Sequence, residues 1–258
     1  MKTVVVKIGG STVDAEGLLM ELGQNIKMVV PEVFPVIVHG GGKDIARHLK
    51  MLNREFTFVE GMRVTDAEMV KIVQMVLSGD VNKRIVNALL VAGVAAAGFS
   101  GVDGELFTAS RMTVNGSDIG FVGKIDRVSP SIIEMCRKVP MVPVISPISR
   151  DAAGCIYNVN ADLAAGECAM ALEADDLIFV SDIAGVMIDN VVQGEIRIPD
   201  IEKLIEDGHI TGGMIPKLRS AADAVRRGVK RVHICGWYGN RTLCDVLDGA
   251  PESGTVIY

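Results

Sequence analysis

Lysine beside glycine is the recurring chemical feature of this sequence. The stretch "VVVKIGGS", residues 4–11, puts Lys7 at the end of an apolar β-branched run and two glycines directly after it. An uncompensated lysine is costly to bury, so this side chain must either reach solvent or meet an anion. The glycines let the backbone turn tightly and bring its N–H groups close to an oxyanion. Lys7 is therefore either a solvated lysine at a strand end or a group that handles phosphate.

A second glycine turn, "VHGGGKDI" at residues 38–45, repeats the order strand, glycines, helix. Freed backbone amides and a helix amino end together form an anion cradle. A tight turn also needs glycine, but three in a row exceed that need. The spacing matches neither the Walker loop nor the dinucleotide fingerprint GxGxxG. We interpret Gly40, Gly41 and Gly42 as an anion-binding turn of another kind.

Arg63 stands in "EGMRVTDAE", after a glycine and just before a helix start. In this stretch Thr65 is the expected N-cap and Glu68 its capping-box partner. An arginine held rigidly there could take a carboxylate through two parallel hydrogen bonds. A plain surface arginine is the alternative.

Two helix starts and one strand end complete the polar set. In "NVNADLAAG", residues 158–166, Asn160 and Asp162 are either an N-cap with a dipole partner or ligand-binding groups that also orient a lysine. The stretch "TGGMIPK" places Lys217 in the first turns of an amphipathic helix, where a solvated lysine is the alternative. "SDIAG", residues 181–185, ends a strand as a nucleotide-contacting turn does.

The elements that must position these groups alternate between two patterns. Valine- and isoleucine-rich runs at residues 3–8, 35–40, 94–99, 141–146, 176–181 and 229–234 predict strands, and helical spacing at 15–30, 66–92, 161–172 and 214–227 predicts helices. The alternation predicts an α/β fold with a mainly parallel sheet covered by helices on both faces. Residues 101–127 and 185–197 favour hairpins. Ligands bind beyond the carboxyl ends of such strands, so the polar groups should meet at one edge.

Composition narrows the class of protein. A chain of 258 residues with 49% hydrophobic residues can bury a substantial core as one domain, residues 1–258, or as two closely joined lobes. It has no apolar run long enough for a membrane helix and no leader pattern, so we expect a cytoplasmic protein with no membrane partner. A net charge of −6 and 4% aromatic residues argue against nucleic acid as a partner. Five cysteines without metal-like spacing indicate reduced thiols.

Together the motifs resemble the amino acid kinase family over almost the whole chain, through the closing "GTVIY". The first two motifs are shared by several kinases of that fold. "GMRVTD", "VNK", "NVNAD" and "GGMIPK" resemble the branch that phosphorylates N-acetyl-L-glutamate on its γ-carboxylate, an early step of arginine biosynthesis. The resemblance implies a three-layer αβα sandwich. Its N-terminal part, about 1–175, would bind the amino acid and form the dimer, and its C-terminal part, about 176–258, would bind ATP.

The resemblance also assigns roles to residues of this chain. Lys7 and Lys217 would contact the transferring phosphoryl group, with Asp162 orienting them. Gly40, Gly41 and Gly42 would offer amides, while Arg63 and Asn158 would hold the carboxylate and acetamido groups of the substrate. Magnesium would be held mainly by ATP, with no protein ligand to the metal. The residues that would line the ATP site are Gly9, Gly10, Ser11, Ser181, Asp182, Gly185, Val186, Met187, His209, Ile210, Thr211 and Gly213.

A carboxylate acceptor explains why no catalytic dyad is evident. Its pKa of about 4.3 leaves it ionised at pH 7, so no general base is required. Other kinases of the fold, acting on carbamate, aspartate, glutamate, UMP or a carrier-linked aminoadipate, are rival readings, as is a non-catalytic sensor. Arginine-inhibited members carry an extra N-terminal helix that builds a hexamer, whereas the first strand here begins at about Thr3. We therefore expect a homodimer, formed through the long helix after Thr65, without strong arginine feedback.

Overall fold

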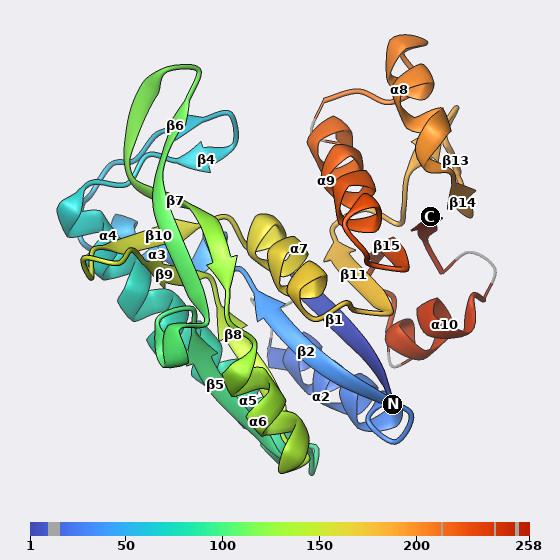
Figure 1. Ribbon diagram of the computed structural model, residues 1–258, viewed down its shortest axis with the longest axis horizontal. Coiled ribbons are helices and arrows are strands. Elements are labelled where there is room, and N and C mark those ends of the chain that lie inside the picture. The colour runs from blue at the N-terminus through green and yellow to red at the C-terminus, as the bar shows by residue number, and fades with distance from the viewer. Residues whose placement is uncertain (10–15, 213, 240, 251–252) are drawn as a thin grey trace.

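The computed structural model describes residues 1–9, 16–212, 214–239, 241–250 and 253–258, and its centre is an eight-stranded sheet (Figure 1). Gly10, Ser11 and Gly213 of the expected ATP set lie outside the described residues. The sheet contains, in spatial order, β14 (Glu195–Ile196), β16 (Thr255–Ile257), β15 (Arg231–Gly236), β11 (Asp176–Ser181), β1 (Lys2–Ile8), β2 (Val33–His39), β8 (Val142–Ser146) and β5 (Ala96–Ser100). All neighbours are parallel except β15 and β16. The expected mainly parallel sheet is confirmed.

Helices cover both faces of this sheet because successive strand residues point to opposite sides. On β1, Val5 packs on one face with helices α6 (Ser131–Lys138), α7 (Ala161–Ala171) and α9 (Met214–Arg226). Val4 and Val6 pack on the other face with α2 (Glu16–Val29), α3 (Gly42–Met51), α5 (Asn82–Val91) and α10 (Thr242–Asp248). The α/β class and its layered arrangement therefore follow the predicted alternation.

The segment expected to be one helix over residues 66–92 differs in its middle. It consists of α4 (Ala67–Gln74), a π-helical segment η1 (Met75–Val81) and α5. A π segment shifts the side-chain register of the helix beyond it. Here η1 and the glycine turn after β2 are in such close contact that a Cβ on Gly41 would lie 2.6 Å from Leu77 Cδ2. The register shift thus sets the helix against the turn that the sequence marks for anions.

Strands outside the main sheet form a small barrel of mixed parallel and antiparallel pairs and several hairpins. Strands β6 (Phe107–Val114), β7 (Ser117–Val128), β9 (Ile148–Arg150) and β10 (Ile156–Val159) close into a small barrel. The hairpin β6–β7 confirms the expectation for residues 101–127, and the hairpin of β12 (Met187–Ile188) and β13 (Val191–Val192) confirms that for 185–197. A further hairpin, β3 (Phe58–Val59) with β4 (Met62–Arg63), was not expected. Short helices η2 (Asp103–Glu105) and α8 (Ile198–Glu206) complete these parts.

The N-cap of α4 differs from the one predicted from the sequence. Asp66, not Thr65, is the N-cap, and its carboxylate accepts hydrogen bonds from the backbone N–H groups of Glu68 and Met69. The Thr65 hydroxyl instead donates to the carbonyl oxygen of Arg63. Aspartate caps helices as well as threonine does, so the two adjacent candidates could not be separated by type. The cap at Asn160 is confirmed, with bonds from the N–H groups of Asp162 and Leu163.

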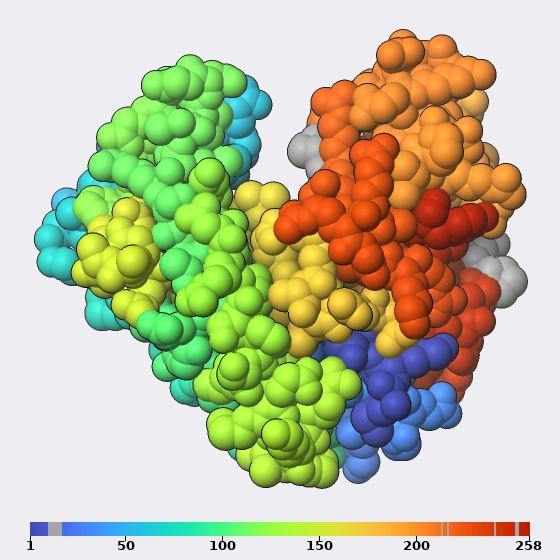
Figure 2. Space-filling model, viewed as in Figure 1, coloured from blue at the N-terminus to red at the C-terminus, as the bar shows by residue number. Residues whose placement is uncertain are grey.

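The molecule has two upper arms separated by a groove (Figure 2). One arm contains the β6–β7 and β3–β4 hairpins, the other contains α8 and α9, and α7 lies at the floor between them. Within the described part of the chain, every helix is too short or too polar to span a bilayer. The groove lies above the carboxyl ends of β1 and β11, where ligands are expected in open α/β sheets.

Candidate active site

Lys7, Asp162 and Lys217 come together at the carboxyl edge of the sheet. Lys7 lies near the end of the central strand β1 with 9% of its surface exposed, and its Nζ is 2.8 Å from one Asp162 carboxylate oxygen. Lys217, from the first turns of α9, places its Nζ 3.2 Å from the other oxygen. Asp162 lies in the first turn of α7, whose amino end points into the groove. Three residues far apart in sequence thus form one charged cluster.

The charge state of this cluster is set by opposing effects. Burial would raise the pKa of Asp162, but the ammonium groups of Lys7 and Lys217 outweigh it and hold that pKa below its usual range. Asp162 is therefore an anion at neutral pH, and its lowered pKa makes it a weak proton acceptor. Each ammonium has three N–H donors, so both keep donors for a ligand after binding Asp162. The cluster suits a ligand with several negative oxygens.

The glycine turn lies beside this cluster, between β2 and α3. Gly41 is the N-cap of α3, so the first amides of that helix have no intrahelical acceptor. The N–H of Gly40, by contrast, donates to the carbonyl oxygen of Ile8 at 2.9 Å. The amide role expected for Gly40 is therefore already taken by the neighbouring strand. At the end of β1, a Cβ on Gly9 would lie 3.6 Å from Lys7 Nζ, an ordinary contact, so the space beside the lysine does not by itself require a glycine.

Arg63 is the last residue of β4 in the β3–β4 hairpin, and it is buried, with 8% of its surface exposed. Its Nη2 donates to the carbonyl oxygen of Gly42 at 3.1 Å, which connects the hairpin to the glycine turn. Its guanidinium carbon lies 4.0 Å from the ring centre of Phe56 and 4.7 Å from that of Phe58. Burial lowers the pKa of Arg63 from its usual value, yet a guanidinium stays charged at neutral pH. Its Nη1 has no hydrogen-bond partner among the described residues.

A cavity of about 190 Å³ joins the glycine turn, the arginine and the start of α7. Its polar lining includes Arg63, Asn158 and Asn160, and its apolar lining includes Leu77 and Val122. Asn158 lies on β10, which pairs with β7 and β9. The cavity therefore has a cation at one side, amides at another and an apolar wall.

A second cavity of about 520 Å³ extends from this region into the groove. Asp162 and Lys217 line it together with Met62 of the β3–β4 hairpin and Gly212 before α9. Both upper arms thus contribute to its walls, and the Lys217 ammonium also lies 6.0 Å from the ring centre of Phe179. The charged cluster stands where the two cavities approach each other.

The residues after β11 that were expected to line the nucleotide site differ in how deeply they are buried. Val186 and Ile210 are buried in the core, with 0% and 2% of their surface exposed, so their side chains cannot line a nucleotide site. The Val186 N–H also donates to the hydroxyl of Thr255 at 2.8 Å. Asp182, Met187, His209 and Thr211 are exposed, Ser181 is half-buried, and Gly185 is packed so closely that a Cβ would lie 2.7 Å from Val192. Among the described lining residues of the 520 Å³ cavity, Gly212 is the one next to this set.

His39 and Asn82 form a buried pair that sequence reasoning missed. The His39 imidazole contacts the Gly40 carbonyl oxygen through Nδ1 and the Asn82 amide through Nε2, and both residues are 0% exposed. Asn82 Nδ2 also donates to the carbonyl oxygen of Val144. Burial, with a smaller contribution from the charges of Lys83 and Arg84, lowers the pKa of His39 to about 4, against the raising effect of its hydrogen bond to the Gly40 carbonyl oxygen. Asn82 belongs to the "VNK" motif, so that motif supports the glycine turn from behind.

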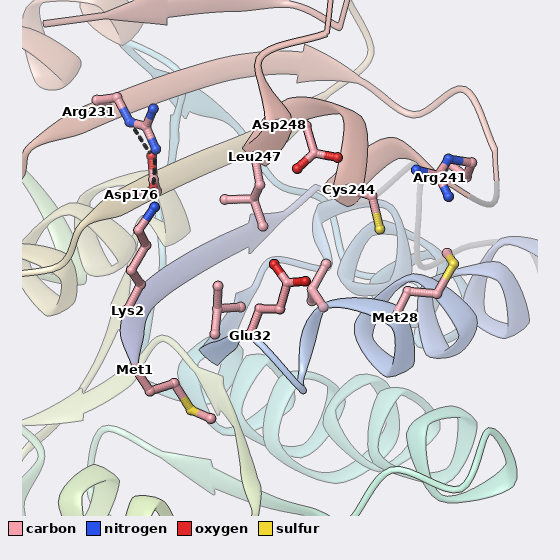
Figure 3. Close-up of a pocket in the computed structure, with 12 residues that line it drawn as sticks. Met1, Lys2, Met28, Glu32, Asp176, Arg231, Arg241, Cys244, Leu247 and Asp248 are labelled. Carbon is pink, nitrogen blue, oxygen red and sulfur yellow. Dashed lines mark hydrogen bonds and ion pairs between the residues drawn. The ribbon is translucent and has the colours of Figure 1, made fainter.

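A third cavity, of about 580 Å³, lies at the opposite, amino edge of the sheet (Figure 3). Lys2, Glu32, Arg241 and Asp248 contribute charged groups of both signs to its lining. At its wall, Asp176 is fully buried and accepts hydrogen bonds from Arg231 at 2.8 and 3.1 Å. His233 Nε2 lies 2.7 Å from the same carboxylate. This cluster joins β11 to β15.

Comparison with known proteins gives agreeing results for sequence and structure. The sequence model of the amino acid kinase family matches residues 2–236. The chain is 40% identical to "Acetylglutamate kinase, chloroplastic" of Arabidopsis thaliana, covering 99% of this chain and 75% of the relative. It is 45% identical to "Acetylglutamate kinase" of Caldanaerobacter subterraneus subsp. tengcongensis, covering 90% and 79%.

Two solved structures show the same fold at low identity. An N-acetylglutamate synthase from Neisseria gonorrhoeae, complexed with coenzyme A and N-acetylglutamate, matches with a TM-score of 0.88 and 23% identity. The match covers 99% of this chain but only 59% of the synthase chain. Carbamate kinase from Giardia lamblia bound to AMP-PNP matches with a TM-score of 0.71 and 16% identity, covering 99% and 98%.

Proposed function

The chain belongs to the amino acid kinase family, and from that premise we propose that it transfers the γ-phosphoryl group of ATP to the γ-carboxylate of N-acetyl-L-glutamate. The product is N-acetyl-L-glutamyl 5-phosphate, an early intermediate of arginine biosynthesis. The observation that carries this function is the Lys7–Asp162–Lys217 cluster, beside a glycine turn and a cavity that contains a buried arginine. Two lysines suit the transferring phosphate, and the arginine suits the carboxylate that does not react.

The reaction requires positioning of two anions more than proton transfer. A γ-carboxylate oxygen forms a bond to the γ-phosphorus while the bond to the bridging oxygen of ADP breaks, and no proton moves. The acceptor is already ionised at neutral pH, which agrees with the lack of any role for Asp162 as a base. Lys7 and Lys217 lower the repulsion between the anions and stabilise charge on the equatorial and leaving oxygens. Asp162 holds the two ammonium groups in place for this task.

The protein side of the site fits a metal that is carried by ATP. Asp162 is already paired with two lysines, so it has little charge to offer a cation. The described residues contain no group of three histidine, cysteine or acidic side chains that could hold a metal. Magnesium, held mainly by phosphate oxygens, supplies further neutralisation of the transferring group.

The two arms of the groove suggest which part of the chain binds which substrate. The N-terminal part, residues 1–175, supplies the glycine turn, Arg63 and Asn158, and in the proposal it binds N-acetylglutamate. The C-terminal part, residues 176–258, would bind ATP near Lys217. Exposed residues of its loops, Asp182, Met187, His209 and Thr211, are the side chains that support this placement, together with the half-buried Ser181. Gly9 and Gly185 would contribute backbone near the phosphates.

Assembly and compartment are part of the same proposal. The helix from α4 to α5 exposes Met75, Leu90 and Val91, with 63%, 53% and 61% of their surfaces accessible. A second copy packed on this helix would cover those apolar side chains, so we propose a homodimer. The five cysteines are all free thiols, which suits a reducing compartment such as the cytoplasm.

The test is an acceptor panel measured by ADP release with ATP and magnesium. N-acetyl-L-glutamate should support turnover, whereas L-glutamate, L-aspartate, carbamate and UMP should support little. Turnover with a different acceptor would keep the fold and the two lysines but reject the proposed substrate. Binding of N-acetylglutamate and ATP without any ADP release would support a sensor instead.

A further inference from the structure

The guanidinium of Arg63 is held on three sides before any substrate arrives. Its central carbon lies over the Phe56 ring, 4.0 Å from the ring centre, and over the Phe58 ring at 4.7 Å, and the Gly42 carbonyl oxygen accepts a hydrogen bond from Nη2. Nη1 is buried and has no acceptor among the described residues. A buried donor without an acceptor is costly unless a ligand supplies one. The fixed plane therefore keeps one nitrogen ready for an anion.

Strand geometry explains why two phenylalanines meet one arginine. Phe58 pairs directly with Arg63 in the antiparallel hairpin, so their side chains lie on the same face. Phe56 stands two residues before Phe58, and the N–H of Val64 donates to Thr57, which keeps the chain extended there. Alternation then returns Phe56 to the face of Arg63. The two rings meet edge to face, with centres 5.7 Å apart and planes at 86°.

We propose that Phe56 is a positioning residue for N-acetylglutamate, acting by fixing the plane of the Arg63 guanidinium toward the substrate's α-carboxylate. This inference rests on the proposed function. An arginine side chain loses much rotamer freedom when it is held in one geometry. Because the ring imposes that geometry in the free protein, substrate binding does not bear this cost again. Without the ring the guanidinium can turn away, and the substrate must order it.

Phe56 rather than Phe58 is the residue that isolates this effect. Phe58 lines the 190 Å³ cavity itself and is 55% exposed, so replacing it would also change the cavity wall. Phe56 is not among the described lining residues of that cavity and is half-buried. Its ring is also the nearer of the two to the guanidinium. An effect of Phe56 on the substrate therefore passes either through Arg63 or through the Phe58 ring that it meets, and the Arg63→Ala background separates the two routes.

The experiment compares Phe56→Leu with Phe56→Tyr, which restores a ring face. We expect Phe56→Leu to raise the KM for N-acetylglutamate about tenfold, the scale of one cation–π contact, with the KM for ATP and kcat within about twofold. Phe56→Tyr should recover most of the loss. The matched control is Phe34→Leu, which removes a ring 4.6 Å from the Arg137 guanidinium at the other end of β2. It should leave all three constants unchanged.

A double-variant cycle separates positioning from general damage. In an Arg63→Ala background, adding Phe56→Leu should change the KM for N-acetylglutamate less than twofold, because the group that Phe56 holds is gone. Calorimetry of N-acetylglutamate binding to the parent, the two single variants and the double variant gives the same comparison of affinities without turnover. If Phe56→Leu folds too weakly, Phe56→Met supplies the second unringed variant.

Two results overturn the inference. One is an unchanged KM in Phe56→Leu or Phe56→Met, and the other is the same tenfold rise with and without Arg63. Binding and turnover of N-acetylglutamate by the unmodified protein are measured first. If the unmodified protein neither binds nor phosphorylates it, the proposed function is rejected instead.

Discussion

The two edges of the central sheet each hold an aspartate between two basic side chains, half-buried at the carboxyl edge and fully buried at the amino edge, but the clusters differ in what they leave available. At the carboxyl edge, Asp162 lies between Lys7 and Lys217. At the amino edge, Asp176 pairs with Arg231, as Figure 3 shows, and also with His233. In both places the charge partners overcome the effect of burial and lower the aspartate pKa. Electrostatics alone therefore does not distinguish the two clusters.

Geometry does distinguish them. The planar guanidinium of Arg231 occupies both oxygens of Asp176, and that carboxylate is 0% exposed. The two ammonium groups at Asp162 each keep spare N–H donors, and Asp162 and Lys217 line a cavity whose walls come from both arms. Cavity size does not separate the edges, because the amino edge has a cavity of about 580 Å³ and the carboxyl edge has cavities of about 190 and 520 Å³. What distinguishes the functional edge is the presence of ammonium N–H donors that Asp162 does not use, next to a glycine turn.

Removing a lysine from the carboxyl edge should have the largest effect. Lys7→Ala and Lys217→Ala should each lower kcat by roughly 10² or more, the scale of losing one preorganised charge contact. Lys230→Ala is the matched control, because that exposed lysine pairs with Asp175 at the amino edge. Steady-state ADP release would measure all three, and near-normal turnover in both site variants would refute the assignment of the lysines.

Breaking the amino-edge cluster should affect stability and spare catalysis. Asp176→Asn leaves Arg231 and His233 without their carboxylate, and we expect a loss of about 3 kcal/mol in the free energy of unfolding. Urea denaturation would measure this loss. The KM values and kcat should stay near those of the parent at a temperature where the variant is folded. A large fall in kcat together with unchanged stability would mean that the two edges have been assigned the wrong way round.

Buried His39 behind the glycine turn should make stability depend on pH. Its pKa is lowered from 6.5 to about 4 in the folded protein, so the imidazole is neutral there while the unfolded chain takes up a proton below about pH 6.5. The contribution of His39 is fully present above that pH and is lost as the pH falls toward 4, by about 2 kcal/mol between pH 7.5 and 5.

Urea denaturation at the two pH values measures this loss. A His39→Gln variant should lack that part of the pH dependence, whereas His48→Gln, which leaves the buried imidazole in place, should keep it. Equal pH dependence in His39→Gln and the parent would show that His39 is not held neutral by burial.

The smallest expected effect concerns binding alone. Arg63→Ala should raise the KM for N-acetylglutamate by at least about tenfold, because a charge-assisted contact to the carboxylate is lost, and should barely change the KM for ATP. Initial rates with each substrate varied in turn would measure both. An increase confined to ATP would show that the two subsites are exchanged.

The fold could be predicted from the sequence because its signals are local. Valine- and isoleucine-rich runs predicted six of the eight strands of the sheet, all except β14 and β16, and their alternation with helical spacing indicated a parallel order. The ends of the strands then brought Lys7 and the glycine turn together, as open α/β sheets do. The π segment at Met75–Val81 could not be foreseen, since its residues fit an ordinary helix and packing against Gly41 accompanies the change.

The charged residues and glycines of the candidate site could be predicted from the sequence, but the residues that hold them in place could not. Lysines and glycines at strand ends are visible in the sequence, but His39, Asn82 and Phe56 act through contacts between segments far apart or across a hairpin. The alternation "FTF" before "EGMR" was the available signal for Phe56, because it places two rings on one strand face. The burial of the Val186 and Ile210 side chains could not be foreseen, because it depends on packing that no local pattern shows.

Trapping the product with hydroxylamine tests the central claim most directly. An acyl phosphate formed from N-acetylglutamate and ATP would react to give a hydroxamate whose position mass spectrometry can assign. The account predicts the γ-hydroxamate with the parent protein and with Lys230→Ala, and about 10²-fold slower formation with Lys7→Ala or Lys217→Ala. ADP release without any hydroxamate, or a hydroxamate on the α-carboxylate, would contradict it.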